Sequence, residues 1–154
     1  MHTNLDIAAG GVTERLCEAI GLTNVKEFIA HDGFLIREAE CDINDADKLA
    51  EHIKTQLGTA VRYADSGKSI RRVLVCSGSG GNYLSDVISA GYDALISADI
   101  KHNVFIDAVN SGVAVFDAGH YQSENIIVKP LCDILSNQFG DIKFKKLSNN
   151  IKFI

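Results

Sequence analysis

One turn of the chain brings a histidine and a carboxylate to a spacing that suits chemistry. His120 and Glu124 lie four positions apart and follow the apolar run 113–116, which is typical of a short buried strand. The apolar periodicity of residues 126–139 predicts a helix immediately afterwards, and Gly119 allows the backbone to bend sharply between the two elements. If both residues lie in the first helical turns, their Cβ atoms are roughly 6 Å apart on one face, beside the partly positive helix start. One metal ion or one transferred proton could then contact both side chains.

The same two residues also have an ordinary structural interpretation. His120 could be a surface or cap residue, and Glu124 a carboxylate that interacts favourably with the dipole of the helix start. For an isolated His-x-x-x-Glu pair this interpretation is the more common one. The other polar residues of the chain therefore bear on the choice.

The composition is that of a soluble globular protein without a nucleic-acid surface. The chain has 154 residues, 46% hydrophobic and 23% charged, which is enough for one compact domain or two small lobes that share a core. Its formal net charge of −5, with no basic stripe, argues against nucleic-acid binding. Neither a secretory signal nor an apolar stretch of membrane-spanning length is present in the sequence. The four scattered cysteines include no Cys-x-x-Cys pair and are typical of a reducing compartment, so we expect a cytoplasmic protein.

The elements that must position His120 and Glu124 divide into two predicted lobes. The stretch 65–69 is the most linker-like in the sequence, so we place one lobe at 1–66 and the other at 67–154. In the first lobe, Thr13 is the expected cap of a helix that ends at Gly21. The predicted strands of this lobe are 2–7, 26–30, 34–39 and 59–64, with a hairpin turn at Asp32-Gly33, and its second helix is 46–57, capped by Asn44 or Asp45.

The second lobe alternates continuous apolar strands with helices. This pattern predicts an α/β fold with mainly parallel sheets flanked by helices. The predicted strands are 72–76, 94–98, 113–116, 142–147 and 151–154, and the predicted helices include Leu84 to Ile88, 103–110 and 126–139. In such sheets ligands bind beyond the carboxyl ends of the strands. Four polar residues fall at these ends: Ser77, Asp99, Asp117 and His120.

Three further motifs each have a chemical and a structural interpretation. The turn 77–81 follows a strand and could present backbone N–H groups to a phosphate, but it matches no standard phosphate-binding pattern, and a tight packing turn is the favoured role. Asp99 could supply a ligand or an acid/base group, or it could cap the next helix beside an exposed His102. Asp6 ends the predicted first strand, and His2, roughly 13 Å away along such a strand, could join it only if the chain bends.

Four blocks of the sequence resemble one known family. In chain order they are His2-Thr3-Asn4-Leu5-Asp6 with Gly10-Gly11-Val12, then 73–81, then 96–101, and last Asp117-Ala118-Gly119-His120-Tyr121 with Ser123-Glu124. The chain is similar over nearly its whole length to the Nif-three-like family of dinuclear metal-centre proteins, also labelled GTP cyclohydrolase 1 type 2 homologues. The last block is the most diagnostic of the four.

The resemblance implies two similar α/β lobes, a pair of divalent metal ions between them, and a toroidal hexamer. It makes Asp6, His120 and Glu124 metal ligands, and it does not distinguish zinc, iron, manganese and magnesium. The family's site also takes two adjacent histidines from a segment upstream of the His-Thr-Asn-Leu-Asp block, and this chain contains no His-His pair. We therefore expect the carboxyl-terminal portion of the fold, with the amino-terminal segment missing. A second departure is Lys101-His102-Asn103, where the family usually has Lys-Tyr-His.

Three functional hypotheses follow from the resemblance. The first is a metal-dependent hydrolase that acts on a nucleotide such as GTP or on another phosphate ligand, since paired ions activate water and hold a phosphate or ring carbonyl. The second is a non-catalytic metal-binding or regulatory module that works through assembly, and the third is an inert remnant. Because three side chains leave most positions of two ions to water, we expect weak or single metal binding unless a neighbouring subunit completes the site. Apolar surface left uncovered by a missing segment favours a homo-oligomer over a monomer.

Overall fold

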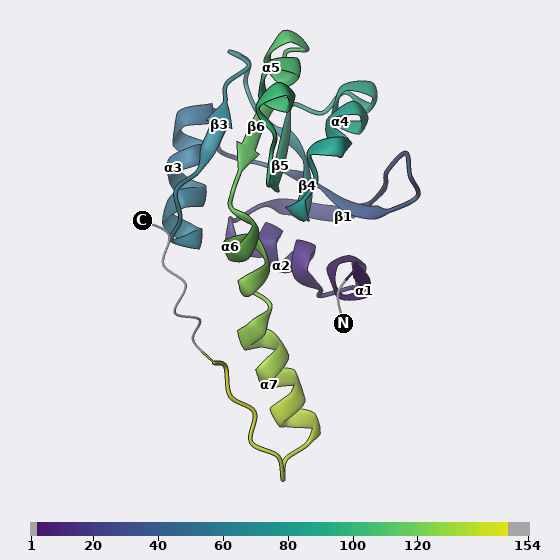
Figure 1. The fold of residues 1–154 in the computed structure, drawn as a ribbon, viewed down its shortest axis with the longest axis vertical. Coiled ribbons are helices and arrows are strands. Elements are labelled where there is room, and N and C mark those ends of the chain that lie inside the picture. Colours follow the sequence, from purple (N-terminus) through teal and green to yellow (C-terminus); the bar gives the residue numbers. More distant parts are fainter. Residues whose placement is uncertain (1–2, 148–154) are drawn as a thin grey trace.

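The strands of the protein form one six-stranded sheet with helices around it (Figure 1). The structure is a computed structural model that describes residues 3–147. The strand order is β1-β2-β4-β5-β6-β3, with bounds β1 Thr23–Ile29, β2 Leu35–Glu40, β3 Arg62–Ala64, β4 Arg72–Ser79, β5 Ala94–Ala98 and β6 Ala114–Asp117. The helices are α1 Thr3–Ile7, α2 Val12–Ala19, α3 Ala46–Leu57, the 3-10 turn η1 Gly81–Tyr83, α4 Leu84–Ala90, α5 His102–Asn110, α6 His120–Asn125 and α7 Val128–Gln138. The expected α/β fold class is confirmed.

The sheet is parallel in its centre and antiparallel toward its edges. β4, β5 and β6 pair in parallel, as the alternation of strands and helices in the second lobe predicts. β2 is antiparallel to β4, β1 to β2 and β3 to β6. The β1–β2 pairing follows from the short turn at Asp32-Gly33, because a turn of this length can join only antiparallel strands. The sheet as a whole is therefore mixed.

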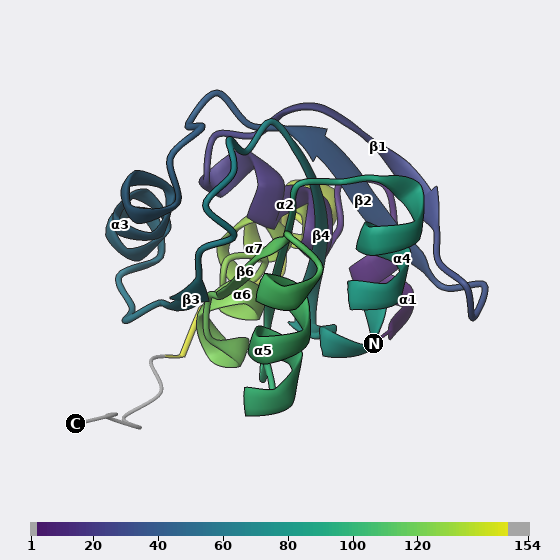
Figure 2. The same cartoon turned by 90° about the horizontal axis from the view of Figure 1, so that it is seen from above.

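Both faces of the sheet are covered, because successive side chains of a strand point to opposite sides. On β4, Val73 and Val75 pack in one core cluster with residues of α2 and α3. Leu74 and Cys76, between and after them, pack in a second cluster with residues of α4 and α5. Figure 2 shows α3 and α4 on either side of the strands. The parallel strands are therefore fixed from both sides, and so are their carboxyl ends.

Strands from both predicted lobes contribute to this sheet. β2 pairs with β4 and β3 pairs with β6, across the expected boundary near residues 66 and 67. Residues of α3, such as Leu49, share a core cluster with Val75 and Phe116. The two segments are therefore joined by backbone hydrogen bonds and by a common core.

Three sequence-based expectations were wrong. Within the expected strand 2–7, residues 3–7 form the short helix α1, since five residues of alternating polarity are too few for the pattern to outweigh packing against α2. The expected strand 142–147 is irregular chain, because it follows α7, which extends away from the sheet in Figure 1, and so has no neighbouring strand to pair with. Thr13 does not cap α2, which begins one residue earlier after Gly11. His2 and the predicted strand 151–154 lie outside the described residues.

The described helices do not include one with the length and apolar character needed to cross a bilayer. All four cysteines are free thiols. Cys17, Cys41 and Cys76 are buried and Cys132 is partly exposed. Burial raises the pKa of the Cys17 thiol to about 12, so this side chain behaves as a small apolar core residue.

Candidate functional site

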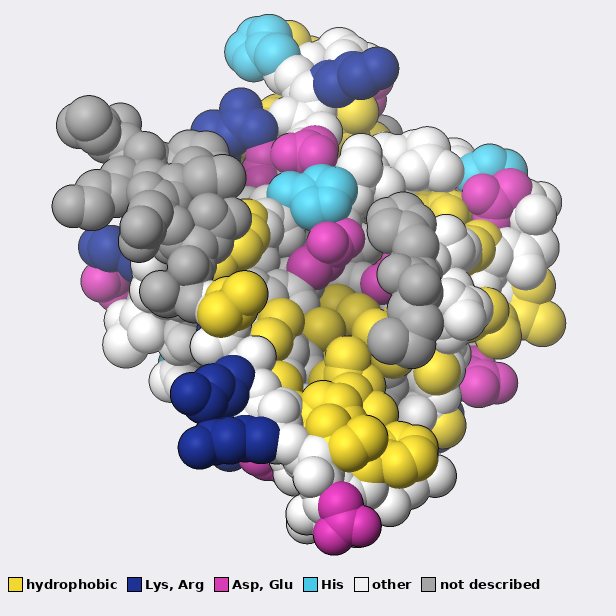
Figure 3. Space-filling view, turned by 60° about the horizontal axis from the view of Figure 1, so that its bottom comes forward, with side chains coloured by type: hydrophobic (Ala, Val, Ile, Leu, Met, Phe, Trp, Pro, Cys, Tyr) yellow, Lys and Arg dark blue, Asp and Glu magenta, His cyan; other side chains and the backbone are white. Residues whose placement is uncertain are grey.

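Polar side chains gather where the three parallel strands end. Ser77 lies near the end of β4, Asp99 directly follows β5, and Asp117 ends β6. Three residues later, His120 begins α6. Asp99 and His120 therefore lie beyond strand ends as predicted, whereas Asp117 is the last residue of its strand, and Ser77 lies within β4 because this strand continues to Ser79. On the face of the molecule in Figure 3, histidine and acidic side chains lie next to a hollow with apolar walls.

The imidazole of His120 lies between two carboxylates. Its Nδ1 is 2.7 Å from Oδ2 of Asp99, and its Nε2 is 3.0 Å from Oε1 of Glu124. The hydrogen bond to Asp99 raises the pKa of His120 above its ordinary value, and the negative charge of Glu124 adds to this. The expected meeting of His120 and Glu124 on one face of a helix is confirmed, and Asp99 is an additional partner.

The glycine-rich turn packs directly against the side chains of His120 and Glu124. Gly78 has a φ of +66°, and a Cβ atom there would lie 2.7 Å from Oε1 of Glu124 and 3.3 Å from Nε2 of His120. The Gly78 N–H donates to Oγ of Ser123 at 3.3 Å, and the Gly78 carbonyl accepts from Oγ of Ser97 at 2.9 Å. The turn is thus a close packing surface for α6, which is the role favoured by its sequence.

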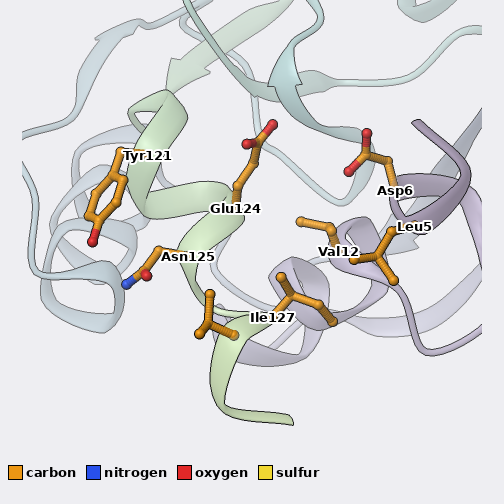
Figure 4. Close-up of a pocket in the computed structure, with 8 residues that line it drawn as sticks. Leu5, Asp6, Val12, Tyr121, Glu124, Asn125 and Ile127 are labelled. Carbon is orange, nitrogen blue, oxygen red and sulfur yellow. The ribbon is translucent and has the colours of Figure 1, made fainter. Parts of the chain in front are cut away.

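Asp6 lies across a pocket from Glu124. The pocket has a volume of about 280 Å³ and joins α1 and α2 to α6 and the start of α7; its lining residues are Leu5, Asp6, Val12, Tyr121, Glu124, Asn125, Ile127 and Val128. In Figure 4 the carboxyl groups of Asp6 and Glu124 lie at the same end of this pocket, with Leu5, Val12 and Ile127 toward its other end. Both carboxylates also act on Cys76, whose pKa is raised to about 12 by burial first and then by the charge of Asp6.

A buried arginine holds the backbone that follows Asp6. Arg37, on β2, is fully buried and donates from Nη2 to the carbonyls of Ile7 at 2.8 Å and Ala8 at 3.3 Å. Its Nε donates to Oε1 of Glu14, on α2, at 3.0 Å. A side chain at Gly11 would collide with the carbonyl of Leu5, so the α1–α2 turn requires glycine there. The sheet thereby fixes the position of α1 and of the carboxylate it carries.

The comparison with known families decides what kind of protein this is. A model of the family Duf34/NIF3 (NGG1p interacting factor 3) matches residues 1–152. The chain belongs to this family. The resemblance inferred from the four sequence blocks is therefore confirmed.

Individual Duf34/NIF3 relatives agree with this assignment. The chain is 27% identical over 139 residues to a protein of Lactococcus lactis and 30% identical over 158 residues to one of Nostoc sp., both named GTP cyclohydrolase 1 type 2 homolog. These matches cover 87% and 96% of this chain but 53% and 58% of the relatives, so the chain spans little more than half their length. The fold matches a crystal structure of the Staphylococcus aureus hypothetical protein SA1388 with a TM-score of 0.82 at 23% identity, covering 100% of this chain and 67% of the other.

The side chains of this Duf34/NIF3 chain provide a donor pair that suits a divalent cation. One imidazole nitrogen and one carboxylate oxygen, 3.0 Å apart, are ligand types used by zinc, iron and manganese. Within residues 3–147, no three His, Cys, Asp or Glu side chains lie close enough together to form a metal site of their own. His120 and Glu124 therefore fit such an ion as a pair, with Asp6 on the far side of the same pocket.

A larger cavity lies on the other side of His120. It has a volume of about 700 Å³ and polar walls that include Thr59, Arg62, Asp99 and Gln122. His120 lines this cavity, Glu124 lines the smaller pocket, and Tyr121 lines both. The contact between His120 and Glu124 thus lies at the junction of the two hollows.

Arg37 and the bond between Asp99 and His120 were not predicted from the sequence. An arginine that directly follows apolar strand residues, as in Leu35-Ile36-Arg37, is a signal that a buried partner exists, although it does not say which. Asp117, expected among the functional residues, accepts from the Ile100 N–H at 3.1 Å and is paired with the Arg62 guanidinium. It therefore supports the loops around the cavities.

Proposed function

We propose that this protein binds a divalent metal ion through Nε2 of His120 and a carboxylate oxygen of Glu124, with Asp6 contributing from across the pocket. The observation that carries the proposal is the 3.0 Å approach of these two donors at the carboxyl ends of parallel strands. Asp6 is proposed as the third ligand because it lines the same pocket as Glu124.

The residues around the pair prepare it for a cation. Asp99 holds the opposite ring nitrogen, and Gly78 leaves room for both donor side chains to lie on the turn. A bound divalent ion would supply Lewis-acid chemistry and an activated water for hydrolysis. The apolar walls formed by Leu5, Val12 and Ile127 limit the access of bulk water from one side.

As the reaction, we propose metal-dependent hydrolysis of a nucleotide or another phosphate-bearing substrate. The support is twofold: the curated relatives are named as homologues of a GTP cyclohydrolase, and a cavity of about 700 Å³ with an arginine in its wall adjoins His120. A cavity of this size is within the range of small-molecule sites. Arg62 gives the wall a positive charge, although Asp117 already pairs with it.

A non-catalytic assembly module is the second candidate, and specific surface features favour it. Helix α7 has no buried residue and extends from the body of the molecule in Figure 1. Ile134 and Phe139 on and after it are 51% and 45% exposed. In this proposal the chain forms homo-oligomers, and a neighbouring subunit supplies ligands that complete an otherwise incomplete dinuclear site. Metal binding by the single chain is then weak or limited to one ion.

Metal titration of His120→Ala and Glu124→Gln tests the proposal. We expect the unmodified protein to bind Zn²⁺ or Mn²⁺, and each variant to lose on the order of 100-fold in affinity, because each removes one of few ligands. His31→Ala is a matched control, since His31 forms a similar pair with an aspartate elsewhere. Unchanged metal affinity in His120→Ala would refute the proposed site. Two tightly held ions per chain would refute the expectation that the single chain binds metal weakly or binds only one ion.

The two candidate functions give different results with nucleotides. A hydrolase releases product from GTP only when metal is present, and His120→Ala abolishes both metal binding and turnover. An assembly module shows metal-dependent association measured by light scattering, with no nucleotide hydrolysed at any metal concentration.

A further inference from the structure

Asp99 stands at a place where the backbone is unusual. Its φ is +51°, in the left-handed region that side chains other than glycine rarely adopt, and Asn24 is the one other such residue among those the structure describes. The chain is anchored on both sides: Ala98 is a fully buried residue of β5, and the Ile100 N–H donates to Asp117 at 3.1 Å. The position of the Asp99 carboxylate is therefore set by fixed neighbours, and strain of this kind concentrates at functional sites.

The ordinary structural role for Asp99 is not the one it has. By its place in the sequence Asp99 could cap the following helix, but α5 has Lys101 as its N-cap, with no side-chain cap hydrogen bond. The Asp99 side chain is 58% exposed, so it does not fill the core. Its Oδ2 instead lies 2.7 Å from Nδ1 of His120. The strained position thus serves a contact with the imidazole.

This contact determines which ring nitrogen carries the proton in neutral histidine. Both ring nitrogens face carboxylates, which can only accept, and the contact of Nδ1 with Asp99 is the shorter, at 2.7 Å against 3.0 Å from Nε2 to Glu124, so it favours a proton on Nδ1 in the neutral ring. Nε2 is then the nitrogen without a proton, on the side of Glu124, where a cation would lie between the two donor atoms. Histidines that bind metals usually donate their other N–H to a carboxylate or carbonyl, which fixes the tautomer and the orientation of the ring.

We propose that Asp99 is a positioning residue of the site: it holds the Nδ1 proton of His120, so that Nε2 is the nitrogen available to a divalent cation. The inference rests on the proposed metal binding by His120 and Glu124. It adds a residue that touches no metal itself and acts through the imidazole. It also assigns a role to the Asp99 carboxylate, which lies at Nδ1 of His120 and lines the larger cavity together with it.

Asp99→Gly is the sharpest variant, because glycine accepts the left-handed φ and the protein should fold at least as stably as before. Asp99→Asn keeps the size and removes the charge, and Asp107→Asn, at an exposed position of α5, is the control for charge alone. The first readout is the pair of ¹⁵N chemical shifts of the His120 ring in metal-free protein at alkaline pH. The second is the affinity for Zn²⁺ by titration.

We expect the Nδ1–H tautomer in the unmodified protein and in Asp107→Asn, and a shift toward Nε2–H in Asp99→Gly. Zn²⁺ affinity should fall on the order of 10- to 100-fold in Asp99→Gly, with a smaller loss in Asp99→Asn. An unchanged tautomer and affinity in Asp99→Gly would overturn the inference. If the unmodified protein binds no Zn²⁺, the proposed function fails, and the ¹⁵N shifts alone still decide whether Asp99 sets the state of the ring.

Discussion

Two histidine–aspartate pairs in this molecule share a geometry and differ in their surroundings. In both, Nδ1 lies 2.7 Å from a carboxylate oxygen: His120 pairs with Asp99, and His31 pairs with Asp86. Asp86 is buried on α4 and also accepts the backbone N–H of His31 at 2.8 Å. That pair therefore fastens the tip of the β1–β2 hairpin to α4, whereas the Asp99 carboxylate is exposed and its described bond goes to the ring.

The difference lies in what the rest of each ring contacts. The His31 side chain is 54% exposed and lies beside the ring of Tyr83, with 6.2 Å between the ring centroids. In the other pair, Nε2 of His120 meets the Glu124 carboxylate directly above Gly78. A histidine–aspartate hydrogen bond thus does not identify a functional site by itself. A functional site is better indicated when a second metal-donor side chain, such as Glu124, lies within reach of the other ring nitrogen and next to a cavity.

Arg37 holds the backbone that follows Asp6, and the His31 pair has no such counterpart in the described part of the chain. Replacing Arg37 should therefore have the largest effect on stability. Arg37→Met leaves the Glu14 carboxylate and the Ile7 and Ala8 carbonyls without their buried donor. We expect the free energy of unfolding to fall by about 3 kcal/mol, measured by urea denaturation. The exposed pair Lys54–Glu51 is the control, and Lys54→Met should cost less than about 1 kcal/mol.

The same variant separates stability from binding. With α1 loosened, Asp6 no longer stays opposite Glu124, so the Zn²⁺ affinity of folded Arg37→Met should decrease. Full affinity in a destabilised but folded variant would exclude Asp6 from the ligand set.

Two glycines, one beside each pair, give a matched comparison of intermediate size. Gly78 and Gly91 have φ values of +66° and +71°; Gly78 lies under His120, and Gly91 ends the helix that carries Asp86. Alanine at either position should reduce stability by about 1–2 kcal/mol, because both are left-handed. Only Gly78→Ala should also weaken Zn²⁺ binding, since its Cβ meets Glu124, whereas a Cβ at Gly91 has no atom within 4 Å in the described structure. Equal affinities in the two variants would contradict this.

The pH dependence of the His31 pair gives the smallest effect. The hydrogen bond to Asp86 raises the pKa of His31 above the value near 6.5 of the unfolded chain. The stabilisation of the folded state by this hydrogen bond is therefore complete below about pH 6.5 and is lost as pH rises through the higher pKa of His31 in the folded state. Melting temperatures followed upward from about pH 6 should decline less in His31→Ala than in the unmodified protein. His102→Ala, at an exposed position, should follow the unmodified curve.

Local signals in the sequence were sufficient where one residue type dictates the structure. The helix 46–57 was predicted to the residue, because Asp45 accepts from the Lys48 N–H and Gly58 ends the helix in a left-handed conformation. The meeting of His120 and Glu124 was predictable for the same reason, since four helical positions fix it.

Contacts between distant segments were not predictable from local patterns. Asp99 reaches His120 only because β5 and β6 are neighbours in register, and the alternation of strands alone does not give that register. The helix of Asp6 depends on Arg37 from β2, roughly a fifth of the chain away. The strand expected at 142–147 shows the converse case, because an alternating pattern becomes a strand only beside an available edge.

The junction of the two hollows at His120 has a thermodynamic consequence. The two nitrogens of an imidazole share one π system, so withdrawing electrons at Nε2 makes the N–H at Nδ1 a stronger donor to Asp99. If a cation binds beside Glu124 as proposed, a ligand of the larger cavity that competes for Asp99 would weaken the binding of that cation, and the cation would weaken the binding of that ligand by the same factor. In that case the two affinities would be coupled through this single ring, and measuring either one in the presence of the other ligand would report on both.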